Sequence, residues 1–196
     1  MGVSLSKGGK VSLAKVAADA GISSLKRVLV GLGWNANRFD GGADFDLDAS
    51  VFLLGANGKC RTDKDFIFYS NLIGPGIQHM GDERTGASEG DDEQIKVSLD
   101  DIPADIERIV FAVTIDKADE RNQNFGQVEQ SYIRLVDEDT GVELLRCDLG
   151  EDFSIETAVV FSELYRHNGE WKWNSILSGY SGGLAALCAS YGIEVE

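Results

Sequence analysis

Apolar and polar residues alternate with a period of two through most of this chain, and this alternation predicts β-strands. The clearest cases are Arg27–Trp34 and Ile109–Asp116, in which one face of the predicted strand is apolar at every second position. Weaker versions of the same pattern predict six more strands, which are Asp65–Ser70, Glu93–Leu99, Val128–Val136, Val142–Leu149, Thr157–His167 and Glu170–Leu177.

Turn and helix signals lie between the predicted strands. Asn168-Gly169 predicts a hairpin with a type I′ turn, and residues 137–141 predict a second hairpin connection. Helical patterns are few and short. They comprise Ser12–Ala20, a single turn opened by Pro103, and Leu184–Tyr191 followed by Gly192.

The length and the number of short strands predict one domain that spans residues 1–196. Hydrophobic residues make up 43% of the chain, which is enough for a sizeable core. Many short strands with tight turns favour an all-β fold with a few short helices. We expect a β-sandwich of two mostly antiparallel sheets, with about five strands in each. The polar stretch Gly74–Asp92 is expected to be a long loop, a kind of segment that often carries function.

Charge excludes several function classes. The chain has 33 acidic against 18 basic residues, so its net charge of −15 opposes binding to nucleic acids and favours cations or a basic partner. No run of 18 apolar residues exists, so membrane insertion is not expected. Residues 1–15 lack a signal-peptide core, which favours a cytoplasmic protein, and the three widely spaced cysteines are expected to be free thiols.

The segment Asp40–Leu53 carries the most informative pattern. As a strand it places Asp44, Asp46 and Asp48 on one face and apolar residues on the other. Successive carboxylates would lie about 6.5–7 Å apart and repel one another by roughly 2.5 kcal/mol at an effective dielectric of about 20. Exposure to water, basic neighbours or a bound hard cation could offset this repulsion.

A second acidic cluster favours the cation. Glu89–Glu93, together with Asp82 and Glu83, forms a dense group with few basic residues near it, and Asp40 adds another carboxylate. All these ligands are oxygens, which argues against structural zinc, and the spacing is not that of an EF-hand. Many carboxylates with backbone carbonyls suit Ca²⁺ better than Mg²⁺, so we predict two Ca²⁺ ions bound between loops at one end of the sandwich.

Several ordered motifs resemble the TerD family of tellurium-resistance and stress-response proteins. The first is residues 41–50, GGADFDLDAS, and the others are residues 65–69, 90–93, 124–128, 163–172 and 182–185. The resemblance covers nearly the whole chain. It implies a cytoplasmic, calcium-binding β-sandwich without enzymatic activity. It also implies a role in resistance to tellurite and in tolerance of phage, colicins or oxidative stress, together with protein partners in a stress-response complex that could be associated with a membrane.

The resemblance also implies a set of metal ligands. These are Asp44, Asp46, Asp48, Asp91, Asp92 and Glu93, with Asp40, Asn71 and Asp82 as further candidates. This chain departs from the family pattern in two places. It has Trp34-Asn35 where a Trp-Asp pair is frequent, and Ser70-Asn71 where paired asparagines are common. Both changes keep oxygen ligands, so they bear on affinity more than on binding.

Three rival functions need weighing. Residues 46–50 resemble the DxDx[TV] motif of Mg²⁺-dependent phosphohydrolases, but that chemistry needs a hydrophobic strand before the motif, and here it follows. A direct reaction of tellurite with a thiol finds little support, because basic neighbours of the cysteines are few. A purely acidic interaction scaffold, in which metal is incidental, is compatible with the net charge.

Overall fold

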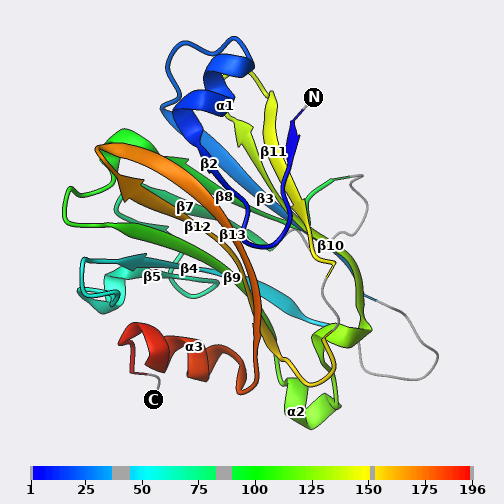
Figure 1. Ribbon diagram of the computed structural model, residues 1–196. Helices are drawn as coiled ribbons and strands as arrows, with labels where there is room; N and C mark the ends of the chain where they lie inside the picture. Colours follow the sequence, from blue (N-terminus) through cyan, green and yellow to red (C-terminus); the bar gives the residue numbers. More distant parts are fainter. Residues whose placement is uncertain (1, 37–44, 83–89, 151–152, 195–196) are drawn as a thin grey trace.

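The computed structural model describes residues 2–36, 45–82, 90–150 and 153–194, and it consists of two β-sheets packed face to face (Figure 1). The first, sheet A, has the strand order β1-β11-β10-β3-β8-β7-β6. Its strands are β1 (Val3–Ser4), β3 (Arg27–Ala36), β6 (Ile73–Gly74), β7 (Ile77–Asp82), β8 (Glu93–Ser98), β10 (Val128–Asp137) and β11 (Glu143–Asp148).

Sheet B has the strand order β2-β13-β12-β9-β4-β5. Its strands are β2 (Lys10–Ser12), β4 (Leu47–Leu54), β5 (Phe66–Ile67), β9 (Arg108–Ile115), β12 (Ala158–His167) and β13 (Glu170–Tyr180). Within the described ranges every strand pair is antiparallel except β1 with β11. The predicted all-β sandwich is therefore confirmed.

The sheets contain seven and six strands rather than about five each, because short strands complete their edges. The strands β1, β2, β5 and β6 are only two or three residues long, too short to show a period in the sequence. Of the predicted strand Asp65–Ser70, only Phe66–Ile67 forms a strand, which is β5. The expectation of a loop over Gly74–Asp92 is wrong at β7, where Ile77 and His79 point inward and are buried.

The main core lies between the sheets. It includes Val30 and Leu32 of β3 on one side and Phe111 and Trp173 of sheet B on the other. A second apolar cluster lies on the outer face of sheet B beneath the C-terminal helix α3 (Gly183–Tyr191), where Leu187 and Cys188 join apolar side chains of β4, β5, β9 and β12. Sheet B is therefore buried on both faces over most of its width.

The turns and helices follow the local sequence signals. Asn168 and Gly169 both have positive φ, as a type I′ turn requires, and Gly192 ends α3 with φ +80°. Helix α1 (Leu13–Asp19) begins after Ser12, whose hydroxyl accepts a hydrogen bond from the Lys15 amide. The short helices η1 (Asp63–Asp65), η2 (Leu99–Asp101), α2 (Ala118–Arg121) and η3 (Phe125–Gln127) lie in connections.

One smaller prediction turns out differently, and one short helix was not expected. The residues after Pro103 form a turn closed by a hydrogen bond from the Ile106 amide, with no helix there. Helix α2 has only four residues, too few for a visible helical period, and was not predicted. No helix among the described residues is long and apolar enough to cross a membrane.

Candidate functional site

The carboxylate strand forms at β4 with the predicted division of its faces. The residues on its core side are buried in the space between the sheets, and these are Leu47, Ala49, Val51 and Leu53. Asp48 is half-buried on the opposite side, and Asp46, directly before the strand, is exposed. The carbonyl oxygen of Asp46 accepts a hydrogen bond from the Asp116 amide at the end of β9, which fixes the backbone of Asp46.

Two buried side chains from sheet A hold the start of β4. Strand β5 pairs with β4 only at Val51 and Phe52. The N–H of Ala49 instead donates to Glu93 Oε2 at 2.7 Å, and Nε2 of His79 lies 3.1 Å from the Ala49 carbonyl oxygen. Glu93 and His79 thus take the place of a neighbouring strand and tie the carboxylate strand to the opposite sheet.

Glu93 and His79 also interact with each other. His79 Nε2 lies 3.2 Å from Glu93 Oε2, while Nδ1 accepts a hydrogen bond from the Gly81 amide. Burial lowers the pKa of His79, but the hydrogen bond and charge of Glu93 and the Ala49 carbonyl outweigh it, so the pKa lies above its ordinary value. The pair is a buried polar contact that fixes where β7, β8 and β4 meet.

Asp92 links the second acidic segment to β3. Its Oδ2 accepts a hydrogen bond from the Trp34 amide at 2.7 Å, and its own amide donates to the Leu32 carbonyl. Trp34 and Asp92 flank segments 37–44 and 83–89, which lie outside the described residues. Asp92 therefore holds the described end of the second acidic segment against β3.

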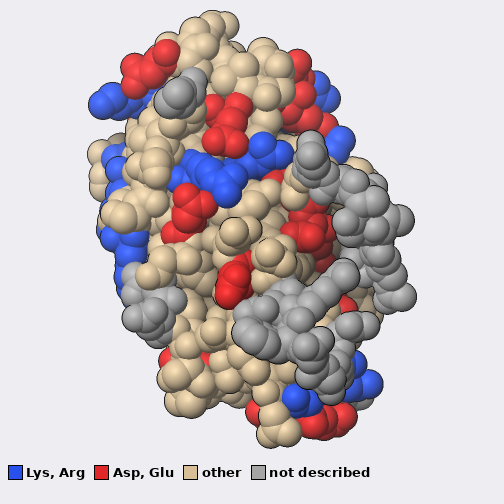
Figure 2. All heavy atoms as spheres, turned by 90° about the vertical axis from the view of Figure 1, so that its right-hand side faces the viewer, with Lys and Arg blue, Asp and Glu red and all other residues tan. Residues whose placement is uncertain are grey.

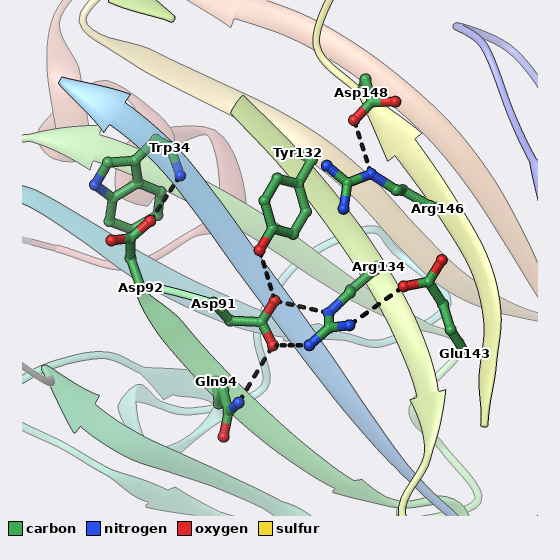
Figure 3. A network of polar contacts seen from close by, with 9 residues as sticks. All are labelled: Trp34, Asp91, Asp92, Gln94, Tyr132, Arg134, Glu143, Arg146 and Asp148. Atoms are coloured by element: carbon green, nitrogen blue, oxygen red, sulfur yellow. Dashed lines mark hydrogen bonds and ion pairs between the residues drawn. The ribbon is translucent and has the colours of Figure 1, made fainter. Parts of the chain in front are cut away.

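Asp91 is the centre of a polar network on the outer face of sheet A (Figure 3). Its side chain is fully buried and forms a bidentate ion pair with Arg134 of β10, with distances of 2.7 and 3.0 Å. The Tyr132 hydroxyl and the Gln94 amide donate to the same carboxylate at 2.9 and 3.2 Å. Arg134 continues the network to Glu143 on β11.

Two glycines of β3 make room for this network. A Cβ atom at Gly31 would lie 2.1 Å from the Asp91 carboxylate, and one at Gly33 would lie 2.3 Å from the Tyr132 ring. Neither glycine has a positive φ, so the requirement is for space and not for backbone freedom. On the outer face of β3 these two glycines therefore leave the space that the Asp91 carboxylate and the Tyr132 ring occupy.

Tyr132 and Arg146 extend the network along β10 and β11. The Arg146 guanidinium lies 3.7 Å from the centroid of the Tyr132 ring, and it also donates to Asp148. Burial, with a smaller effect of the Asp91 charge, raises the pKa of Tyr132 to about 12. The face that carries β10 and β11 shows basic and acidic side chains side by side (Figure 2).

The remaining candidate ligands are scattered. Asp40 and Asp44 lie outside the described residues. Asp82 is the last residue of β7, where it pairs with Glu93, and the Asn71 amide donates to the Phe66 carbonyl at 2.6 Å. Within the described ranges no three acids, histidines or cysteines converge on one point. A complete ligand shell would therefore include residues beyond those ranges, and the ligand set stays a prediction.

Sequence reasoning missed the residues that partner the acids. Arg134, Tyr132 and His79 each occupy an ordinary position in a strand, and nothing in the sequence told which acid each would meet. The alternation in Val128–Val136 did place Tyr132 and Arg134 on the same face. The pairing of β10 with β3, and of β3 with β8, then brings them to Asp91.

The sheet geometry also bears on the phosphohydrolase motif. That motif needs a parallel sheet with helices on its faces. Here β4 pairs antiparallel with both β5 and β9. The environment of residues 46–50 is therefore unlike the one that the motif requires.

Comparisons with known proteins agree with this architecture. The TerD domain matches residues 1–191. The chain is 56% identical to "Tellurium resistance protein TerD" of Serratia marcescens and 55% identical to "General stress protein 16U" of Bacillus subtilis (strain 168), in each case over all of both chains.

A solved structure shows the same fold. The crystal structure of a homologue of telluride resistance protein (TerD) from Streptomyces coelicolor A3(2) superposes with a TM-score of 0.64 at 23% identity. The match covers 85% of this chain and 96% of that one. The domain match, the full-length relatives and the shared fold together establish that this chain belongs to the TerD family.

Proposed function

We propose that this chain is a calcium-binding stress-response protein without enzymatic activity, and that it contributes to resistance to tellurite. Bound calcium orders its acidic loops, which then present a surface to a protein partner. The names of the full-length relatives support the tellurium-resistance and stress-response part of this proposal. The arrangement of the acidic residues supports the calcium part.

The observation that carries the proposal is the fixed position of Asp46 and Asp48. The backbone of Asp46 is held by Asp116, and the start of β4 is held by Glu93 and His79. Two carboxylates are thus kept on the polar side of one strand, and the Ala49 amide of the same strand donates to Glu93 of the second acidic segment. Clustered carboxylates on a rigid support suit a hard cation, and calcium accepts the irregular geometry of such loops.

The acids have different roles in this proposal. Asp46, Asp48 and Asp92 are proposed ligands, together with Asp40 and Asp44. Both carboxylate oxygens of Asp91 and the Oε2 oxygen of Glu93 accept hydrogen bonds from protein donors. These two residues therefore have a positioning role: they hold neighbouring strands and so fix the loops that join them. Calcium, when bound, supplies the positive charge that neutralises the crowded carboxylates.

Isothermal titration calorimetry with Ca²⁺ and Mg²⁺ tests this proposal. The wild-type chain is expected to bind about two calcium ions and to prefer calcium, because a cage rich in carboxylates suits the larger ion. The double variant Asp46→Asn, Asp48→Asn is expected to bind at least about tenfold more weakly, because it loses two charged ligands. Its free energy of unfolding without metal should be unchanged or higher, since repulsion is removed.

The matched control is the double variant Asp19→Asn, Asp100→Asn, which removes two exposed acids elsewhere and should bind calcium like the wild type. Equal calcium binding by both double variants would show the ligand assignment to be wrong. A pull-down of partners in Ca²⁺ and in EGTA tests the partner surface. If the same partner binds equally in both, the chain acts as an acidic scaffold in which metal is incidental.

A further inference from the structure

Exposed apolar side chains gather at the edge of the sandwich where β5 and β6 end the two sheets. Among the described residues eight large hydrophobic side chains are exposed, and four of them fall within residues 69–80. These four form the edge patch, and they are Tyr69, Leu72, Ile73 and Met80, with exposed fractions of 59%, 39%, 70% and 45%. A single exposed apolar side chain is ordinary, whereas a group of them marks an interaction surface.

The pairing of β6 with β7 brings three members of the edge patch together. Ile73 pairs with Gln78, and Met80 follows Gln78 by two positions, so Ile73 and Met80 share the outer face of sheet A. The Leu72 carbonyl accepts a hydrogen bond from the His79 amide at 2.8 Å, which places Leu72 beside the same part of β7. The three side chains are therefore neighbours in space.

Tyr69 completes the edge patch from the turn between β5 and β6. Phe68 and Asn71 exchange two backbone hydrogen bonds across this turn, at 2.8 and 3.1 Å. The Tyr69 ring meets the Phe68 ring edge to face, with centroids 5.0 Å apart, and Phe68 stacks on the buried ring of Phe66. The exposed ring is therefore held in place, so a partner would meet a preformed surface.

The edge patch lies in a segment without formal charge. Residues 66–81 contain no Asp, Glu, Lys or Arg, although such residues make up 26% of the chain. On the next strand Lys96 pairs with Gln78, and the charge of Lys96 is met by Glu138 at 2.7 Å. A strongly charged partner would gain little from this segment, so the surface that matches it is apolar and uncharged.

We propose that the edge patch is the contact between two copies of this chain in a symmetric dimer. A twofold axis brings the same patch of both copies together, and an uncharged apolar patch is complementary to itself. Two chains of net charge −15 repel each other, but exposed charges more than about 8 Å apart are largely screened at physiological salt. Contact through residues 66–81 keeps the carboxylates out of the centre of the interface. The dimer is separate from the proposed calcium site.

Sedimentation equilibrium of the full chain in EGTA tests the dimer without calcium. The patch is small, so we expect a weak dimer with a Kd of about 10–100 μM. The mean mass should therefore rise with concentration from the 21.2 kDa of one chain toward twice that value. A chain that stays monomeric up to about 1 mM would overturn the proposal. Because calcium is absent, neither result bears on the proposed calcium site.

Two opposite charges at one position locate the contact. Ile73→Glu and Ile73→Lys each bring like charges together across the twofold axis, so each should weaken dimerisation at least about tenfold. Ile73 is 70% exposed, so both variants should fold. An equal mixture of the two variants should associate more strongly than either variant alone, because glutamate then meets lysine. Failure of the mixture to recover association would contradict the placement of Ile73 near the axis.

A matched control comes from Ile155, which is 69% exposed and lies in the connection before β12. Ile155→Glu makes the same chemical change outside the edge patch and should dimerise like the wild type. If Ile73→Glu dimerised as well as Ile155→Glu, the two copies would not meet at the edge patch and the proposal would be wrong.

Discussion

Gly31→Ala is expected to lower the free energy of unfolding by about 3–5 kcal/mol, the cost of breaking a buried ion pair. The new Cβ atom would lie 2.1 Å from the Asp91 carboxylate, well inside van der Waals contact. The carboxylate cannot move aside without losing Arg134, Tyr132 and Gln94 as partners. Urea denaturation followed by tryptophan fluorescence measures this change.

Gly90, the residue directly before Asp91, provides the control for this prediction. A Cβ atom at Gly90 would meet nothing within 4 Å, so Gly90→Ala should change the free energy of unfolding by less than about 1 kcal/mol. If Gly31→Ala were no more destabilising than Gly90→Ala, the close approach of Asp91 to β3 would be refuted.

Arg134→Met is expected to lower the free energy of unfolding by about 3 kcal/mol, because it leaves the Asp91 charge buried without its cation. The Asp91 side chain is fully buried, whereas the Arg134 side chain is 28% exposed. The expected loss is therefore placed at the lower end of the range for a buried ion pair, because water already solvates part of the arginine. Arg134→Lys should recover part of the loss, since lysine restores the charge without the bidentate geometry. Chemical denaturation of the three proteins gives the comparison.

An exposed arginine shows how much of the effect is specific to burial. Arg27 and its partner Asp139 are 55% and 46% exposed, so Arg27→Met should lower the free energy of unfolding much less than Arg134→Met does. Asp91→Asn combined with Arg134→Met should be less destabilising than the sum of the single changes, because the uncompensated charge is removed. Strict additivity of the two changes would contradict the ion-pair account.

The long strands were predictable because each is long enough for a period of two to stand out. Arg27–Trp34 and Ile109–Asp116 became β3 and β9 with small shifts of their ends. The strands that escaped prediction are short or carry a polar residue inward. In β7 the inward position is taken by His79, whose polarity is met by Glu93 and Ala49, contacts that only the tertiary structure creates.

The acidic residues of the candidate site were easy to find, but their individual roles were not. Charge density marks Asp91, Asp92 and Glu93 equally in the sequence. The structure separates them, because each successive side chain meets a different partner: Arg134, the Trp34 amide and the Ala49 amide, respectively. Those partners come from three other strands, and no local pattern specifies them.

Calcium binding at Asp46 and Asp48 is the central claim, and a crystal structure from calcium-containing solution tests it most directly. An anomalous difference map should show an ion at about 2.3–2.6 Å from carboxylate oxygens of Asp46 and Asp48, with further oxygens from the adjoining acidic segments. A well-ordered map in which both carboxylates contact only water or protein would contradict the claim.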